Sequence, residues 1–456
     1  MLRDMISVQH AYHYLAPSSL SDETRPHLKL ATSSVGEQLY PHFFEGQVKQ
    51  PRLIAELLTT VQIVVGSRFF TPGAALAKLI ALADPVVTAG GGMLRFEGFS
   101  SCCSTYVRAD LLPESYDGDI VGKGTTNVDF NAPMRAALAR VRDAQGLAMS
   151  VGRHEFALQS GADHVVEKKV ALPLRWIRGM LEVQSYQASM RKRLEVNGHE
   201  ALRFFRSLPK TSTSKTPLWV VAGPFGLRTT TREEAGAIRI VDTSRLRVLE
   251  ALLPKAQSLA VYSDDDQQAN AWALQFPGAR LTLVLSAEVW RGFSGEGQAL
   301  RTLMRSSEVS AVSEVRANLQ WQSLIRADEF AAKLSLSKTE TENALLILGV
   351  SGLTGFDVVE GCYFHRVLPF DLSMVEDMHP RLVGARKLLE GGAVRIIKAS
   401  PLEATVQSSD VEHRVREVEG ELRCTCPWFA KHQGSRGPCK HVLAVESLTH
   451  QGARKH

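Results

Sequence analysis

The hydrophobic positions of the chain follow two periodicities, one typical of helices and one typical of strands. Across residues 51–70 the apolar side chains recur every three or four positions, which predicts an amphipathic helix with a proline in its first turn. Helical spacing also predicts helices at 132–144 and 174–186. Short apolar runs at 94–99 and 105–109 are typical of strands. The mixture predicts an α+β fold.

The length of the chain indicates several domains. A chain of 456 residues is too long for one ordinary core. Residues 1–45 are polar and interrupted by prolines, and we expect an N-terminal arm there, followed by an α+β body domain over residues 46–210. The small, polar segment 211–217 is typical of a linker. After it, residues 218–310 are predicted to form a smaller α/β-like domain.

The pattern over residues 311–372 resembles a winged helix-turn-helix. Three helical segments follow one another, and the third begins at Ser337 with Glu340 three positions on, as in a capping box. A Glu-Gly turn between two apolar runs then predicts a hairpin. The third helix carries Glu340 and Glu342 beside Lys338, and an acidic recognition helix favours protein contact over DNA contact.

Composition and charge add limits to this picture. With 44% hydrophobic and 22% charged residues, the chain is that of a folded protein. Six cysteines are too few and too unevenly placed for a disulfide framework, so we expect a reduced, cytoplasmic protein. The start of the chain lacks the apolar run of a signal peptide, and no run approaches the roughly 20 apolar residues of a membrane span. We therefore expect no membrane partner. The net charge of +5 is too mild to indicate a nucleic-acid partner by itself.

Four residues near the C-terminus have the spacing of metal ligands. Cys424 and Cys426 share one face of a predicted strand, and Cys439 and His441 lie at the start of a predicted helix. The arrangement is Cys-x-Cys, twelve residues, then Cys-x-His, which predicts one tetrahedral Zn²⁺. Four protein ligands close the coordination shell, so the zinc is predicted to be structural. His432 is a rival ligand, but its position within the loop disfavours it.

This pattern resembles a SWIM zinc finger over residues 405–450. The resemblance implies a ββα zinc module associated with DNA binding or protein contacts, found beside ATPases, transposases and ubiquitin ligases. Segments 96–103, 124–131, 172–176 and 289–297 are also similar to bacterial SWIM-finger proteins of about this length. That resemblance implies a partner system with a MoxR-type AAA+ ATPase and a von Willebrand factor A protein.

Basic residues cluster around the predicted zinc ligands. Arg423, Lys431, Arg436 and Lys440 lie within 18 residues. Cations held beside a fixed zinc module can neutralise phosphates, and they can equally serve solubility alone. We treat these four as candidate contacts to nucleic acid or to a protein partner.

Together these patterns predict a zinc-binding, non-enzymatic adaptor that binds nucleic acid, a protein partner or both, and the resemblance implies that it belongs to an ATPase-linked bacterial system. One alternative is a nucleic-acid-processing enzyme, similar to a transposase or nuclease, with its active site within residues 50–310. Such chemistry needs carboxylates clustered around two metals, and Asp117, Asp119 and Asp129 form no recognisable frame for it. The other alternative is a purely protein-binding scaffold, in which the basic residues would be replaceable.

Overall fold

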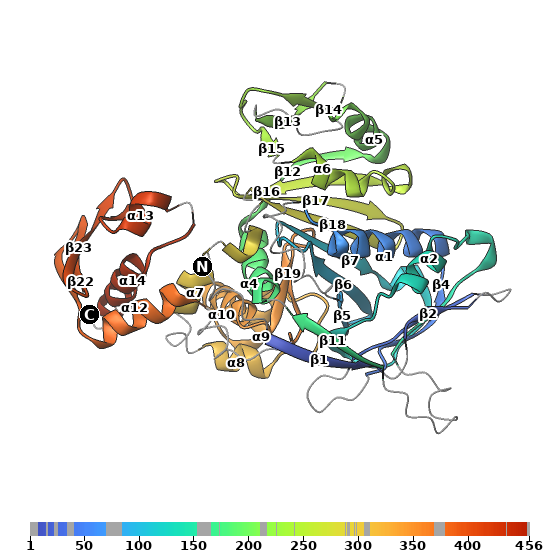
Figure 1. The fold of residues 1–456 in the computed structure, drawn as a ribbon, viewed down its shortest axis with the longest axis horizontal. Helices are drawn as coiled ribbons and strands as arrows, with labels where there is room; N and C mark the ends of the chain where they lie inside the picture. The colour runs from blue at the N-terminus through green and yellow to red at the C-terminus, as the bar shows by residue number, and fades with distance from the viewer. Residues whose placement is uncertain are drawn as a thin grey trace. The chain divides into compact units, whose positions relative to one another are not determined.

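The computed structural model in Figure 1 describes most of the chain. The described residues are 8–14, 17–21, 26–33, 41–69, 84–152, 166–172, 174–209, 217–224, 226–240, 242–287, 289, 292–295, 297, 299–304, 311–368, 379–434 and 436–453. Their contacts divide the chain into two compact units. The first unit comprises Met1–Ser294, Leu319–Arg326 and Gly355–Pro369, and the second comprises Gly295–Asn318, Ala327–Thr354 and Phe370–His456.

An eight-stranded sheet with antiparallel neighbours forms the centre of the first unit. In spatial order its strands are β12 (Arg191–Asn197), β16 (Ser258–Ser263), β17 (Ala269–Phe276), β18 (Ala279–Ser286), β7 (Thr105–Leu111), β6 (Met93–Phe99), β5 (Val86–Gly90) and β9 (Gly124–Asn127). Every residue of β5, β6, β7, β9 and β18 is buried, so both faces of the sheet are covered there.

Helix α1 (Pro51–Gly66) covers part of this sheet by packing on β6 and β7. It confirms the helix expected at 51–70, with a proline in its first turn. The other α-helices in the described part of the unit are α2 (Ala132–Leu138), α4 (Leu174–Ser189), α5 (Gly198–Ser207) and α6 (Thr243–Leu246). Within the described part of the chain, no helix is long and apolar enough to span a membrane.

Smaller sheets complete the first unit. A five-stranded sheet has the order β2 (Ser19–Leu20), β3 (His27–Leu30), β10 (Ala148–Val151), β4 (Phe44–Val48), β8 (Tyr116–Ile120). A three-stranded sheet has the order β14 (Gly226–Thr230), β13 (Leu218–Gly223), β15 (Ile238–Ile240), and a pair joins β1 (Val8–Tyr14) to β11 (Val166–Leu172). Strands β1, β2 and β3 come from the predicted arm 1–45, so the described parts of that arm belong to sheets of the first unit.

The eight-stranded sheet takes strands from both sides of the predicted linker. Residues 210–216, nearly all of that linker, lie outside the described residues. Strand β12 from the predicted body 46–210 pairs with β16 from the predicted domain 218–310, and β7 pairs with β18. The two predicted domains therefore share one sheet, because strand pairing between residues distant in sequence leaves no local signal.

Buried charges on this sheet hold a hairpin made of β19 (Thr354–Asp357) and β20 (Cys362–His365). Asp357 contacts the guanidinium groups of Arg95, Arg108 and Arg280 at 3.0, 2.9 and 3.1 Å. Asp110, across from Arg95 and Arg280 in the sheet, contacts Arg95 at 2.8 Å. Burial alone would raise the pKa of Asp357, but its three arginine partners lower it. The hairpin is therefore fixed to the sheet by charge pairing.

The second unit begins with helices. These are α7 (Ala299–Met304), α8 (Ala311–Ala317), α9 (Ala327–Leu334) and α10 (Lys338–Val350). Helix α10 packs against α8 and α9, and the Ser337–Glu340 capping box is present as expected. The hairpin β19–β20 follows in sequence, but its residues from Gly355 onward belong to the first unit. Three helices followed by a hairpin are present in the predicted order. Whether they form a winged helix-turn-helix stays a prediction.

The end of the chain folds as a sheet covered by helices, which we call the C-terminal module (residues 379–453). Its sheet has the order β21 (Val394–Ala399), β22 (Leu402–Ser408), β23 (Val411–Val418), β24 (Glu421–Cys424). Its helices are α12 (Pro380–Glu390), α13 (Pro427–His432) and α14 (Lys440–Ala453), and α14 packs on α12 and on all four strands. The α+β class is confirmed. The module contains the expected hairpin and helix, and in addition two strands and two helices.

The Asp357 contacts predict a large effect of one substitution on stability. Asp357→Asn would leave three buried arginines short of one counter-charge, and breaking a buried ion pair costs about 3–5 kcal/mol. We expect the urea midpoint of the first unit to fall accordingly. Glu234→Gln, which removes an acid from the exposed pair with Arg228, is the control and should leave that midpoint unchanged. Equal midpoints for Asp357→Asn and the unmodified protein would contradict this account.

Candidate metal centre

Three adjoining elements place the four expected ligands. Cys424 is the last residue of β24, and its side chain lies on the buried side of the sheet with Val415 opposite it. Cys426 is the N-cap of α13, where its sulfur accepts a hydrogen bond from the backbone N–H of Phe429 at 3.4 Å. Cys439 precedes α14, and its sulfur accepts from the N–H of Val442 at 3.4 Å. The cysteine sulfurs thus take the positions that capping side chains usually take.

The loop that joins α13 to α14 depends on one glycine. Gly437 has a φ of +68°, and a Cβ on it would lie 2.7 Å from the backbone oxygen of Gly297. A side chain there would be strained by its backbone conformation and blocked by its neighbour. Gly437 therefore lets the chain turn sharply just before Cys439.

The four ligand atoms converge at one point. They all lie within 4.8 Å of one another, and all four residues are buried. The Nδ1 atom of His441 lies 3.7 Å from the sulfur of Cys424 and 4.0 Å from the sulfur of Cys439. Tetrahedral zinc with ordinary bond lengths places sulfur and nitrogen ligands about 3.6 Å apart. The cluster fits one structural Zn²⁺, held through Nδ1 of the histidine.

The thiol pKa values show how the sulfurs interact. The pKa of Cys439 is lowered to about 4, first because the Cys424 thiol donates a hydrogen bond to it. The same hydrogen bond raises the pKa of Cys424, and burial raises the pKa of Cys426. Three thiolates this close need a cation between them, and zinc supplies that charge.

Other side chains surround the ligands. The ring of His413 on β23 lies 4.4 Å from the ring of His441. Arg381 on α12 lies over the ring of Trp428 at 4.5 Å and donates hydrogen bonds to the carbonyls of Arg436 and Pro438. Arg381 could not be found from the ligand spacing, because α12 is far from the ligands along the chain. His432, the rival ligand, contacts Trp428 and is outside the cluster.

The four expected contact residues lie on different elements and differ in exposure. Arg423 is exposed on β24, Lys431 is exposed on α13, and Arg436 is half-buried in the loop before α14. The half-buried Lys440 donates a hydrogen bond to Ser408 at 2.8 Å. Their roles as contacts stay a prediction.

Comparison with known families identifies this part of the chain. Residues 410–449 match the family described as SWIM zinc finger. The chain carries a SWIM zinc finger. The match covers β23, β24, α13 and most of α14, against the expected 405–450. It does not reach segments 96–103, 124–131, 172–176 or 289–297, so the wider resemblance to bacterial SWIM-finger proteins and the ATPase and von Willebrand factor A partners stay predictions.

The remaining comparisons add little. None of the curated proteins matches the chain. Among solved structures, the proliferating cellular nuclear antigen of Entamoeba histolytica is similar over 54% of this chain and 99% of its own, at 10% identity and a TM-score of 0.32. At that TM-score we carry nothing over from it.

The SWIM finger predicts one zinc per chain, lost when a ligand sulfur is removed. Cys439→Ser should purify with far less than one zinc, because serine is a poor ligand for this ion. Atomic absorption on the purified protein measures this. Cys362→Ser is the control, since Cys362 is buried outside the cluster, and it should keep its zinc. A full zinc complement in Cys439→Ser would contradict the ligand assignment.

Proposed function

We propose that the chain is a non-enzymatic adaptor whose SWIM finger module binds nucleic acid through the outer face of its sheet. The observation that carries this proposal is a group of cations on that face, which we call the basic sheet face: Arg395, Lys398, Arg414, Arg416 and Arg423. Only Arg423 among them was a candidate from the sequence.

The strand register brings these side chains together. Arg395 and Arg414 flank Thr405 in one row across β21, β22 and β23. In the next row Lys398 lies opposite Glu403, and Arg416 lies opposite both Glu403 and Arg423. The buried residues Ala404, Val406, Val415 and Cys424 alternate with these and point the other way.

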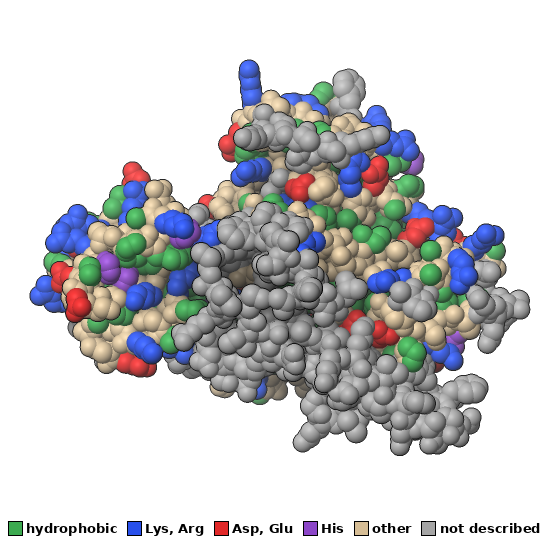
Figure 2. All heavy atoms as spheres, in the orientation of Figure 1, with side chains coloured by type: hydrophobic (Ala, Val, Ile, Leu, Met, Phe, Trp, Pro, Cys, Tyr) green, Lys and Arg blue, Asp and Glu red, His purple; other side chains and the backbone are tan. Residues whose placement is uncertain are grey.

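Cations outnumber acids on this face, which also carries Glu403, Glu412 and Glu421, and Arg423 contacts Glu419 at 3.6 Å. Glu403 contacts Arg414 at 3.4 Å and Arg416 at 3.0 Å, so one acid serves two arginines. Arg416 and Arg423 lie directly opposite each other, and like charges in that position destabilise a sheet. Figure 2 shows lysine and arginine side chains, with a few acids among them, along the margin of the module where β22 and β23 run. An anionic partner would relieve this repulsion.

A nucleic-acid backbone fits such a face. Phosphates bind arginine in paired hydrogen bonds, and their regular spacing suits cations on neighbouring strands. Binding by counterion release does not depend on base sequence, so we expect little sequence preference. Arg414 and Arg416 are each about half exposed and therefore accessible.

Removing two of these cations should weaken binding in a salt-dependent way. For Arg414→Gln/Arg416→Gln we expect at least about a tenfold loss of affinity at low salt, and a logarithmic salt slope lower by about 1 per contact removed. Fluorescence anisotropy with labelled DNA and RNA, at several salt concentrations, measures both quantities. Glu403→Gln should strengthen binding, because it removes the acid between the two arginines.

The matched control removes two charges elsewhere. Arg232 and Lys387 are exposed residues outside the basic sheet face, and Arg232→Gln/Lys387→Gln should bind like the unmodified protein. Equal losses in both double variants would mean that net charge alone governs binding. No affinity for DNA or RNA in the zinc-loaded protein would contradict the proposal.

A protein partner is the second candidate function. Three of the six exposed large hydrophobic side chains among the described residues lie in the module: Ile397, Val411 and Val418, at 48, 54 and 37% exposure. Exposed apolar residues beside charged ones are typical of protein interfaces. The AAA+ ATPase and von Willebrand factor A protein implied by the resemblance are the partners to test, by co-purification.

The enzyme alternative receives no support from the expected acids. Asp117 and Asp119 are exposed on β8, and Asp117 pairs with Lys49. Asp129 is buried and accepts hydrogen bonds from the Ser18 backbone and the Asn131 amide. Among the described residues, the zinc cluster is the one group of three or more histidine, cysteine, aspartate or glutamate side chains that is arranged to hold a metal.

A further inference from the structure

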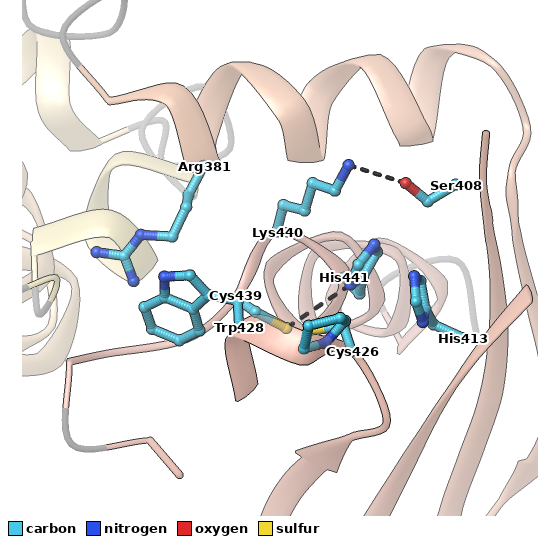
Figure 3. A pocket seen from close by; sticks show the side chains of 9 residues that line it. Arg381, Ser408, His413, Cys426, Trp428, Cys439, Lys440 and His441 are labelled. Atoms are coloured by element: carbon cyan, nitrogen blue, oxygen red, sulfur yellow. Dashed lines mark hydrogen bonds between the residues drawn. The ribbon is translucent and has the colours of Figure 1, made fainter. Parts of the chain in front are cut away.

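A pocket at the zinc site is lined by three of the ligands, Cys426, Cys439 and His441, and by basic and polar side chains beside them. It has a volume of about 310 Å³, and its walls include Arg381, Ser408, His413, Trp428, Lys440 and His441 (Figure 3). One water takes about 30 Å³ in the liquid, so this space holds much more than a single water or the zinc ion. None of the described residues that line it is acidic.

One donor in this pocket lacks an acceptor. His441 would bind zinc through Nδ1, which leaves the ring proton on Nε2. His441 is 3% exposed, and its Nε2 has no hydrogen-bond partner. Histidines that bind metal almost always donate this second N–H to an oxygen. In Figure 3 this nitrogen points toward the side on which Lys440 and Ser408 meet.

Two further polar groups lie at the same wall. The ammonium of Lys440 donates to the Ser408 hydroxyl at 2.8 Å, and that hydroxyl retains a proton of its own. Lys440 is also the first residue of α14, whose N-terminal end favours negative charge. Zinc with three thiolates carries one negative charge, and Lys440 and Arg381 more than offset it. The pocket is therefore suited to an anion.

We propose that this pocket binds the phosphate monoester of a nucleotide, either free or at the end of a strand. Lys440, His441 and Ser408 offer three donor groups, and a phosphate monoester has three acceptor oxygens, whereas an internal phosphodiester has two. The half-buried ring of Trp428 lines the same pocket with the guanidinium of Arg381 over it, and this pair can contact the base of a bound nucleotide. Ser408 and His413 alternate with the basic sheet face, so the pocket lies on the other side of the sheet.

Calorimetric titration of the zinc-loaded full chain tests this site. Adenosine monophosphate should bind at least about tenfold more tightly than adenosine. Lys440→Met and Ser408→Ala should each remove most of that difference, while zinc content stays at one per chain. Lys387→Met, an exposed lysine of α12 outside the pocket, is the control and should keep it. Trp428→Ala should weaken adenosine monophosphate but leave inorganic phosphate unchanged.

Oligonucleotides distinguish the two sources of the phosphate. Preference for a 5′- or 3′-phosphorylated strand over the hydroxyl-ended strand, lost in Lys440→Met, assigns the site to strand ends. Binding of the mononucleotide without such a preference assigns it to free nucleotides. Any of three results would overturn the proposal. The first is equal binding of adenosine and its monophosphate, and the second is an unchanged preference for the monophosphate in both Lys440→Met and Ser408→Ala. The third is binding of a phosphoserine peptide as tight as that of adenosine monophosphate. Because these variants leave the basic sheet face intact, failure here is distinguishable from failure of the proposed function.

Discussion

The convergence of three sulfurs and one imidazole on a single ion is the constraint that orders the C-terminal module. The ligands come from the end of β24, the N-cap of α13 and the first turn of α14. A closed shell of four protein ligands fixes the sheet against both helices. The same arrangement determines where the two surfaces with proposed roles lie on the module. One is the basic sheet face on the outside, and the other is the pocket that His441 shares with the sheet.

Buried charge has a comparable role in the first unit. Four buried arginines (Arg95, Arg108, Arg280 and Arg366) meet three buried acids (Glu97, Asp110 and Asp357) and the half-buried Glu360 on one side of the eight-stranded sheet. Such a network contributes little net stability relative to an apolar core, but it penalises any arrangement that leaves one member unpaired. It therefore selects one register and one position for the hairpin β19–β20.

Local signals were enough to predict some elements and the metal ligands. The zinc ligands follow from residue type and spacing, α1 from its apolar repeat, and the start of α10 from the Ser337–Glu340 capping box. The expected finger, residues 405–450, was close to the matched 410–449 because its ligands mark it. Each of these features depends on residues close together in the sequence.

Features that depend on distant pairing could not be predicted. Arg395 and Arg414 lie in one row only because β22 lies between their strands, and no short motif encodes that register. The shared eight-stranded sheet was missed for the same reason. Arg381 reaches the zinc surroundings from α12, whose sequence contains no ligand. Helix α13 did carry a signal that was overlooked, since Pro427 directly follows a residue able to cap it.

Amide hydrogen exchange with and without a zinc chelator tests most directly whether the ion orders the module. If zinc supplies most of its folding free energy, removal should abolish protection in β21–β24 and in α14. The eight-stranded sheet should keep its protection, because its core and buried charges do not involve the metal. Unchanged protection in the module after verified loss of zinc would contradict the account.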